Sequence, residues 1–152
     1  MAKQTIVLAA DHAGFRLKAL LSAEIQVLGH HILDLGTDGS ESVDYPDFGH
    51  AAARAIVDGD CSLAVICCGT GAGMAMTANR HPGVRAAVCH DLMTARFARE
   101  HNDANVLALG QRIVEPEVAK ECLRIFLSTS FEGGRHKNRV AKIELGDEKE
   151  PL

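Results

Sequence analysis

Residues 62–73 read SLAVICCGTGAG, an apolar run that passes directly into two cysteines and a loop with glycine at every second position. The apolar run has no alternation of polar and apolar residues, which is typical of a parallel strand covered by helices on both faces. Glycines at alternate positions bring consecutive backbone N–H groups toward an anion at the start of a helix. This stretch predicts a buried strand, a tight turn and an anion-binding helix N-terminus.

Apolar runs followed by amphipathic stretches recur along the whole chain, which indicates repeated βα units on one parallel sheet. We expect a single three-layer α/β/α Rossmann-like domain over residues 1–152, with a five-stranded parallel sheet and a C-terminal helical tail from about residue 131. The strands are predicted at residues 5–10, 31–35, 62–67, 84–89 and 105–109. The helices are predicted at residues 14–28, 47–57, 73–79, 92–100 and 116–128, with residues 42–47 as a loop in which Pro46 holds Tyr45 extended.

The composition is that of an ordinary globular protein, with 152 residues, 47% hydrophobic and 24% charged. Disorder, collagen and coiled coil are therefore poor interpretations. A net charge of −4 with interspersed signs gives no basic face for nucleic acid. No apolar run approaches the ~20 residues that cross a bilayer, so we expect a cytoplasmic protein with no membrane partner. The five cysteines form no C-x-x-C pair, and we expect reduced thiols.

Chemically active side chains gather around the ends of the predicted strands. In an open parallel sheet, ligands bind beyond the carboxyl ends of the strands. We therefore expect one edge of the sheet to collect carboxylate, imidazole, thiol, amide and guanidinium groups. The residues concerned are Asp11, His12, Cys68, His101, Asn102 and Arg112. They are scattered singly along the chain, without the i, i+4 pairing of a helical zinc site, so no metal site is predicted.

The glycine loop at residues 69–73 completes none of the common nucleotide motifs. Met74 takes the sixth position of the dinucleotide fingerprint and the position of the arginine in cysteine-dependent phosphatases, and no Lys-Ser/Thr follows for a P-loop. A turn in which the glycines serve only geometry is the alternative. Cys68 favours a chemical role, because a helix N-terminus stabilises a thiolate and makes it a usable base or nucleophile. Cys67 is expected to point to the opposite side of the strand, into the core.

The basic tail carries Arg135 and Arg139 four residues apart, on one face if the segment is helical. Such a pair can clamp a phosphate, and a solvated basic face is the alternative. The tail extends past the last βα unit, so we expect it to pack across a dimer and deliver its arginines into a neighbouring site.

Five motifs in the same order make the chain resemble ribose-5-phosphate isomerase type B, a family that also includes the galactose-6-phosphate isomerase subunits. They are DHAGF at 11–15, DYPD at 44–47, CGTGAG at 68–73, REHNDANVLALGQR at 99–112 and EGGRHKNR at 132–139. The resemblance implies a cofactor-independent isomerase that interconverts D-ribose 5-phosphate and D-ribulose 5-phosphate in the pentose phosphate pathway. It also implies a homodimer, or a tetramer built from it, with sites at the subunit interface.

The same resemblance implies a role for each matching residue. Cys68 is the base that moves the proton, His101 with Asp11 assists ring opening, and Thr70 steadies the reacting oxygens. The enediolate is held by Asn102 and by the backbone amides of Gly69, Gly71, Ala72 and Gly73. Tyr45 lines the sugar pocket. The phosphate is bound by His12, Arg112, Arg135 and Arg139. Relatives with serine in place of Cys68 use a glutamate near the end of the loop, and Met74 stands there, so the cysteine version applies.

Two alternatives remain open beside the pentose phosphate. The first is a hexose 6-phosphate, such as allose or galactose 6-phosphate. Galactose enzymes divide the motifs between two subunits, whereas this chain carries them together, which favours the pentose. The second is a non-catalytic sensor of a sugar phosphate or nucleotide on the same fold. A thiol, imidazoles and a carboxylate argue against it, because a pure binder has no need of them.

Overall fold

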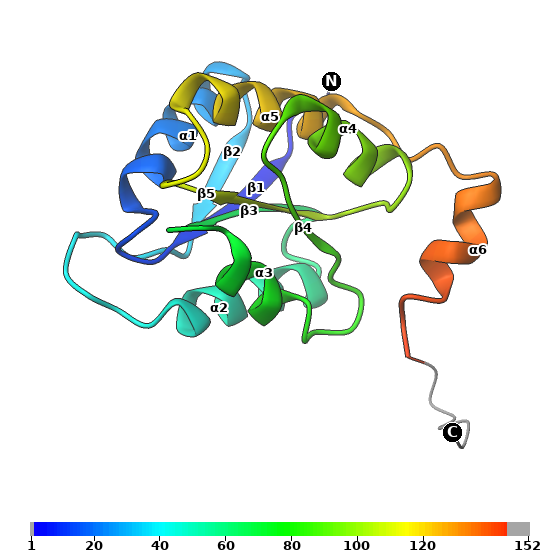
Figure 1. The fold of residues 1–152 in the computed structure, drawn as a ribbon, viewed down its shortest axis with the longest axis horizontal. Helices are drawn as coiled ribbons and strands as arrows, with labels where there is room; N and C mark the ends of the chain where they lie inside the picture. Colours follow the sequence, from blue (N-terminus) through cyan, green and yellow to red (C-terminus); the bar gives the residue numbers. More distant parts are fainter. Residues whose placement is uncertain (1, 146–152) are drawn as a thin grey trace.

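The computed structural model describes residues 2–145, which form one parallel sheet with helices on both faces (Figure 1). The strands are β1 (Thr5–Ala10), β2 (His31–Asp34), β3 (Leu63–Cys68), β4 (Ala86–Val88) and β5 (Val106–Gly110), in the order β2-β1-β3-β5-β4. The helices are α1 (Phe15–Val27), α2 (Tyr45–Val57), α3 (Ala72–Ala78), α4 (Leu92–Glu100), α5 (Pro116–Ser128) and α6 (Arg135–Ala141). The predicted three-layer α/β/α architecture and its helical tail are confirmed.

Successive side chains of the central strands enter two separate cores, because a strand directs alternate residues to opposite faces. In β1, Ile6 and Leu8 pack with α1, α4 and α5, where Phe126 is the largest fully buried side chain. Val7 and Ala9 face the other way, toward the alanine-rich packing of α2 and α3. Burial on both faces explains why these strands are apolar without alternation.

The structure corrects one local prediction that concerns a candidate site residue. Residues 42–47 were expected to be a loop with Tyr45 extended, but α2 begins at Tyr45 and only Asp44 before it is extended. Pro46 is compatible with this start, since the first turn of a helix does not use the N–H that proline lacks. Tyr45 is therefore held by the first turn of a helix. The predicted strand ends are otherwise correct to within two residues, and β3 runs one residue further, to Cys68.

The two ends of the parallel strands define two edges of the sheet, which we call the carboxyl edge and the amino edge. In the ladder between β3 and β5, Cys68 lies level with Gly110 at the carboxyl edge, and Ala64 lies level with Val106 near the amino edge. Helices α4 and α5 return the chain from the carboxyl to the amino edge, as in any right-handed βα repeat.

No helix among residues 2–145 is both long enough and apolar enough to cross a membrane. The tail predicted from about residue 131 contains α6, and its last seven residues, 146–152, lie outside the described part of the chain.

Candidate active site

Cys68 ends β3 at the carboxyl edge, with the glycine loop folded over its sulfur. The side chain is buried, and Cys68 Sγ accepts the backbone N–H of Gly71 at 3.1 Å. Gly71 has φ +83°, a left-handed conformation that glycine adopts without strain, and it caps the start of α3. Thr70 is exposed, and its Oγ1 accepts the N–H of Ala72 at 3.3 Å. The loop thus directs an N–H group at the thiol, as thiolate stabilisation requires.

Two further candidate side chains pack directly on this loop. A Cβ atom added to Gly73 would lie 2.8 Å from the ring of Tyr45, so the ring lies against the loop. A Cβ atom on Gly69 would lie 3.0 Å from Nη1 of Arg112, so the guanidinium lies over that residue. Tyr45 comes from α2 and Arg112 follows β5, yet both reach the loop after β3. Glycine at these positions leaves room for a phenol ring and a guanidinium against the loop that follows Cys68.

The neighbouring Cys67 has the opposite environment. Its side chain is fully buried in the core under α1 and α5, and this burial raises the pKa of the Cys67 thiol well above its ordinary value. Burial likewise raises the pKa of Cys89 to about 12 and that of Cys122 to about 11. These three thiols stay protonated at neutral pH. The side chain of Cys68 faces the other core, and its sulfur accepts a backbone N–H. The predicted burial of Cys67 is confirmed, and the chemical role of Cys68 stays a prediction.

Asp11 and His12 follow β1 at the same edge. The buried carboxylate of Asp11 accepts the N–H groups of Ala13 and Gly14 through Oδ1, both at 3.0 Å, and so holds the turn into α1. His12 Nδ1 accepts the N–H of Val43 at 3.1 Å. A neutral imidazole whose Nδ1 accepts carries its proton on Nε2, so the ring is set to donate from Nε2.

His101 and Asn102 lie elsewhere, and the expectation that they share an edge with Cys68 is wrong. Both residues join the end of α4 to the start of β5, which places them at the amino edge. The four residue steps from Val106 to Gly110, at about 3.3 Å each, put roughly 13 Å of strand between the edges. In a parallel sheet, residues that precede a strand lie at the edge opposite to those that follow one. One chain therefore does not bring His101 to Cys68.

The turn that carries His101 and Asn102 is fixed by ion pairs. Asp103, which has φ +44°, accepts from Arg99 at 3.0 Å and from Arg85 at 3.2 Å. Arg99 also donates to the carbonyl groups of Ala104 and Thr129. The segment after α5 is thereby attached to the end of α4, since the N–H of Glu132 also donates to the Glu100 carbonyl at 3.0 Å.

Helix α6 joins the amino-edge group. Figure 1 shows it beyond β4, at the margin of the molecule. Its Arg135 and Arg139 are exposed and lie one helical turn apart, as predicted. His136 is buried, and its ring stacks on that of His101 with centroids 4.4 Å apart. The tail thus contacts its own chain through His136, while its arginines point outward.

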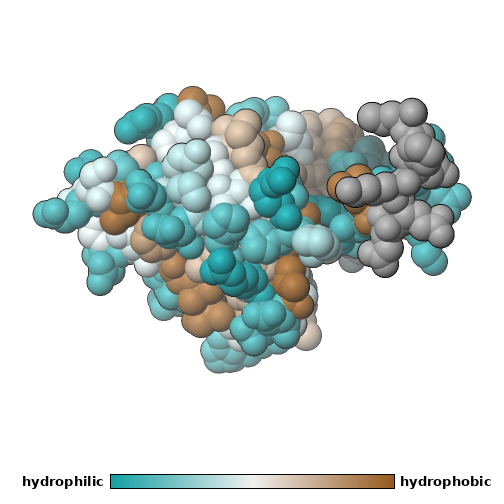
Figure 2. Space-filling view, turned by 90° about the horizontal axis from the view of Figure 1, so that it is seen from below, coloured by the Kyte–Doolittle hydropathy of each residue, from teal (hydrophilic) through white to brown (hydrophobic). Residues whose placement is uncertain are grey.

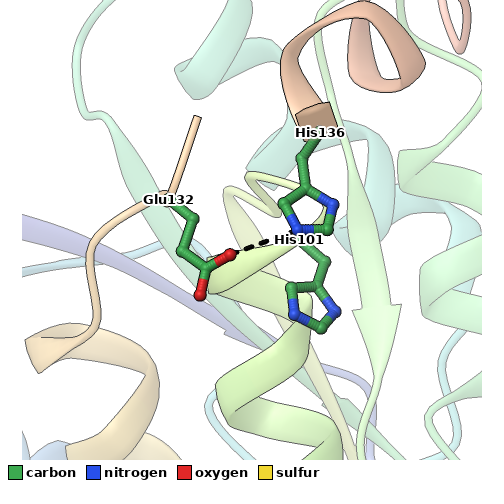
Figure 3. Close-up of side chains that lie close together, drawn as sticks. All are labelled: His101, Glu132 and His136. Carbon is green, nitrogen blue, oxygen red and sulfur yellow. Dashed lines mark ion pairs between the residues drawn. The ribbon is translucent and has the colours of Figure 1, made fainter. Parts of the chain in front are cut away.

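Sequence reasoning missed Glu132 and His136 as partners of His101. His136 Nε2 lies 3.2 Å from Glu132 Oε2 (Figure 3). Phe97 stacks on the other face of His101, with ring centroids 4.6 Å apart. The signal was present, because Glu132 and His136 are four residues apart. His101 precedes Glu132 by 31 residues, so only the fold brings it close to this pair.

Comparisons with known proteins identify the family and the fold of this chain. The family model described as Ribose/Galactose Isomerase matches residues 6–143. Ribose-5-phosphate isomerase B of Escherichia coli is 41% identical over 91% of this chain and 93% of its own, and D-erythrulose-4-phosphate isomerase of Pectobacterium atrosepticum is 41% identical over 91% and 92%. The solved structure of Clostridium thermocellum ribose-5-phosphate isomerase B superposes with a TM-score of 0.90 at 46% identity, covering 91% of this chain and 94% of that one.

Proposed function

Because this chain belongs to the ribose/galactose isomerase family and is a sugar-phosphate isomerase, we propose that it interconverts D-ribose 5-phosphate and D-ribulose 5-phosphate. The observation that carries the proposal is Cys68, whose sulfur receives the Gly71 N–H at the centre of the glycine loop. We place the reaction in the cytoplasm, within the pentose phosphate pathway.

The reaction moves one proton between adjacent carbons of the open-chain sugar. The Cys68 thiolate takes the proton from C2 of the aldose, and the C2–H electron pair forms the C1–C2 double bond of an enediolate while the carbonyl pair moves onto O1. The thiol then returns the proton to C1, a second proton passes from O2 to O1, and the C2 carbonyl of the ketose forms. Hydrogen moves as a proton throughout, so the step needs a base, an acid at the oxygens and donors for the enediolate charge. The amides of the glycine loop are such donors, and losing one typically costs ~3 kcal/mol of transition-state stabilisation.

We propose that the remaining groups come from a second copy of the chain in a homodimer. His101, Asn102, Arg135 and Arg139 all lie at the amino edge, away from Cys68. In a two-fold dimer, the amino edge of one subunit meets the carboxyl edge of its partner twice. Each of two identical sites then contains a thiol from one chain and an imidazole from the other. There His101 assists opening of the furanose ring together with Asp11, and Thr70 steadies the reacting oxygens.

The exposed surface contains apolar side chains for such an interface. Met76 of α3 is 71% exposed, and Met93 of α4 is 57% exposed. Figure 2 views the molecule from the side of α2 and α3 and shows apolar patches between hydrophilic ones. The two methionines lie on opposite faces of the sheet, since α3 packs in one core and α4 in the other, and each is available to a protein interface.

The phosphate is placed between the two chains by the same arrangement. Arg112 lies over Gly69 and the imidazole of His12 is set to donate from Nε2, both at the carboxyl edge. Arg135 and Arg139 of the partner's α6 complete the clamp, since guanidinium groups bind phosphate bidentately. Binding energy from this remote group positions the reacting carbons, so removal of the phosphate should lower turnover as well as affinity.

A second substrate has a specific observation in its favour. The relative from Pectobacterium atrosepticum, named for D-erythrulose 4-phosphate, is as similar to this chain as the Escherichia coli relative, at 41% identity each. A four-carbon substrate uses the same proton transfer and differs only in the distance from carbonyl to phosphate. The distance from carbonyl to phosphate is shorter in a tetrose 4-phosphate than in ribose 5-phosphate, and longer in a hexose 6-phosphate.

The test is isomerisation in D2O followed by NMR, with ribose 5-phosphate, erythrulose 4-phosphate and allose 6-phosphate as parallel substrates. We expect ribulose 5-phosphate to form fastest, with solvent deuterium at the carbon that exchanges. Faster turnover of another sugar phosphate would replace the substrate and leave the chemistry in place. Tight binding without turnover of any of them would contradict the isomerase and support a sensor.

A further inference from the structure

The side chains of His101, Glu132 and His136 form a compact cluster outside the carboxyl edge. One potential ligand atom from each residue lies within 4.8 Å of the other two. The residues come from three places, the end of α4, the segment before α6 and the first turn of α6 (Figure 3). Figure 3 shows the Glu132 carboxylate beside the edges of the two stacked rings, where their nitrogens lie.

The polar contacts of the described residues do not account for this cluster. His136 is 5% exposed, and its Nε2 has no hydrogen-bond partner among those residues. Glu132 Oε2 is 3.2 Å from that nitrogen, within ion-pair distance but without the geometry of a hydrogen bond. A buried imidazole nitrogen without a partner costs free energy unless something binds it. The side chain of Glu132 is 55% exposed, so solvent has access to the cluster.

We propose that His101, Glu132 and His136 bind a divalent transition-metal ion of the zinc type. Two imidazoles and one carboxylate are the donor set that Zn²⁺ accepts while keeping a fourth position open. Imidazole nitrogen favours zinc, copper, nickel and cobalt over magnesium and calcium, which prefer oxygen ligands. A bound ion would satisfy the buried His136 Nε2 and connect α4 to α6.

The ion would also engage His101, which the proposed function places in the active site of the partner subunit. A ring nitrogen that holds a metal cannot exchange protons with the sugar. Zinc is therefore expected to inhibit isomerisation reversibly, and this second claim rests on the proposed function. The binding itself does not rest on it, because it needs only the three side chains within one chain.

The binding test uses the full chain freed of metal by chelation, in a Cys68→Ser background that removes the loop thiol as a competing ligand. Equilibrium dialysis measures Zn²⁺ per chain, and the visible absorption of Co²⁺ reports the coordination geometry. We expect one ion per chain. We expect Glu132→Gln and His136→Gln each to weaken binding at least about tenfold, the lower end of what even an outer-shell partner contributes.

The matched control is His81→Gln. His81 Nε2 lies 2.7 Å from His50 Nδ1, so this pair is a second place where two imidazoles meet. We expect zinc affinity to be unchanged in this variant. Equal affinity in the wild-type cluster and in Glu132→Gln would overturn the proposal. Because Glu132 is exposed, that variant keeps the test valid even if the buried His136→Gln fails to fold.

Activity is then measured on the protein with native Cys68, with and without Zn²⁺. Turnover of the metal-free protein tests the proposed function by itself. We expect added Zn²⁺ to inhibit the wild type, EDTA to reverse the inhibition, and Glu132→Gln to need at least about tenfold more zinc for the same inhibition. Zinc that binds at the cluster but leaves turnover unchanged would overturn the claim that the ion engages His101.

Discussion

The two edges of the sheet differ in the side chains they carry and in how tightly those side chains are packed. At the carboxyl edge, Cys68 and the glycine loop are closely packed, and Gly71 lies against the backbone of Leu109. At the amino edge, His101 and the α6 arginines lie on a turn and a short outer helix, with Gly133 in open space. In the proposed reaction the first edge holds the base and the enediolate, and the second supplies an acid and cations. Neither edge carries the full set of proposed groups, and for that reason we propose a site shared between two chains.

The largest effect is expected from removing Cys68, the proposed base at the carboxyl edge. Cys68→Ala leaves no group to move the proton, so turnover should fall by about 10²–10⁴-fold, the usual contribution of a positioned acid or base. The measurement is the initial rate with ribose 5-phosphate, with circular dichroism to confirm the fold.

The adjacent buried thiol is the control for this change. Burial raises the pKa of Cys67 and keeps it protonated, so Cys67→Ala should retain turnover within a few-fold. Stability should fall by about 1 kcal/mol, as expected when a small core group is removed. Near-normal turnover of Cys68→Ala, or loss of turnover only in Cys67→Ala, would contradict the assignment of the base.

A smaller effect is expected from Arg139, which we propose as part of a phosphate clamp at the amino edge. Arg139→Ala removes charge-assisted hydrogen bonds worth about 1.5–3 kcal/mol, so KM should rise about 10–100-fold, with a smaller change in kcat. Steady-state kinetics checks this. Lys137→Ala removes the same charge from another face of α6 and should raise KM less. If both substitutions raise KM equally, Arg139 acts only through the net positive charge of α6 and does not contact the phosphate.

The smallest effect compares two glycines with similar backbone conformation. Gly71 has φ +83° and Gly133 has φ +68°, but an added Cβ would lie 3.1 Å from the Leu109 carbonyl carbon at Gly71 and would meet nothing within 4 Å at Gly133. Both alanine variants lose about 1 kcal/mol from the left-handed backbone, and Gly71→Ala loses about 1–3 kcal/mol more from crowding. Denaturant unfolding measures this. Equal losses would show that the carboxyl edge is no more tightly packed.

The sequence was sufficient to predict the architecture. Apolar runs without alternation and amphipathic stretches of helical length are local patterns, and each of the five strands and five main helices was found from them. The error at Tyr45 arose because a residue before proline usually avoids helical geometry, whereas here the helix begins there with proline in its first turn. Such a boundary depends on packing that local preference does not contain.

The candidate site was predictable only in part. Residues that follow strands were placed correctly at the carboxyl edge, because strand ends and loop chemistry can be read locally. His101 and Asn102 were placed at the wrong edge, since they precede β5 and chain direction decides the side. The cluster with Glu132 and His136 was missed because it joins residues distant in sequence. The docking of a second chain is a property of surfaces, which local patterns do not determine.

The most direct test of the two-chain site is complementation between two inactive variants. Cys68→Ala and His101→Ala are each purified, shown to be inactive, then unfolded together and refolded as a mixture. If each site takes Cys68 from one chain and His101 from the other, a mixed dimer contains one intact site. Random pairing should then restore about one quarter of the wild-type activity per chain. A mixture that stays as inactive as its components would contradict a site shared between two subunits.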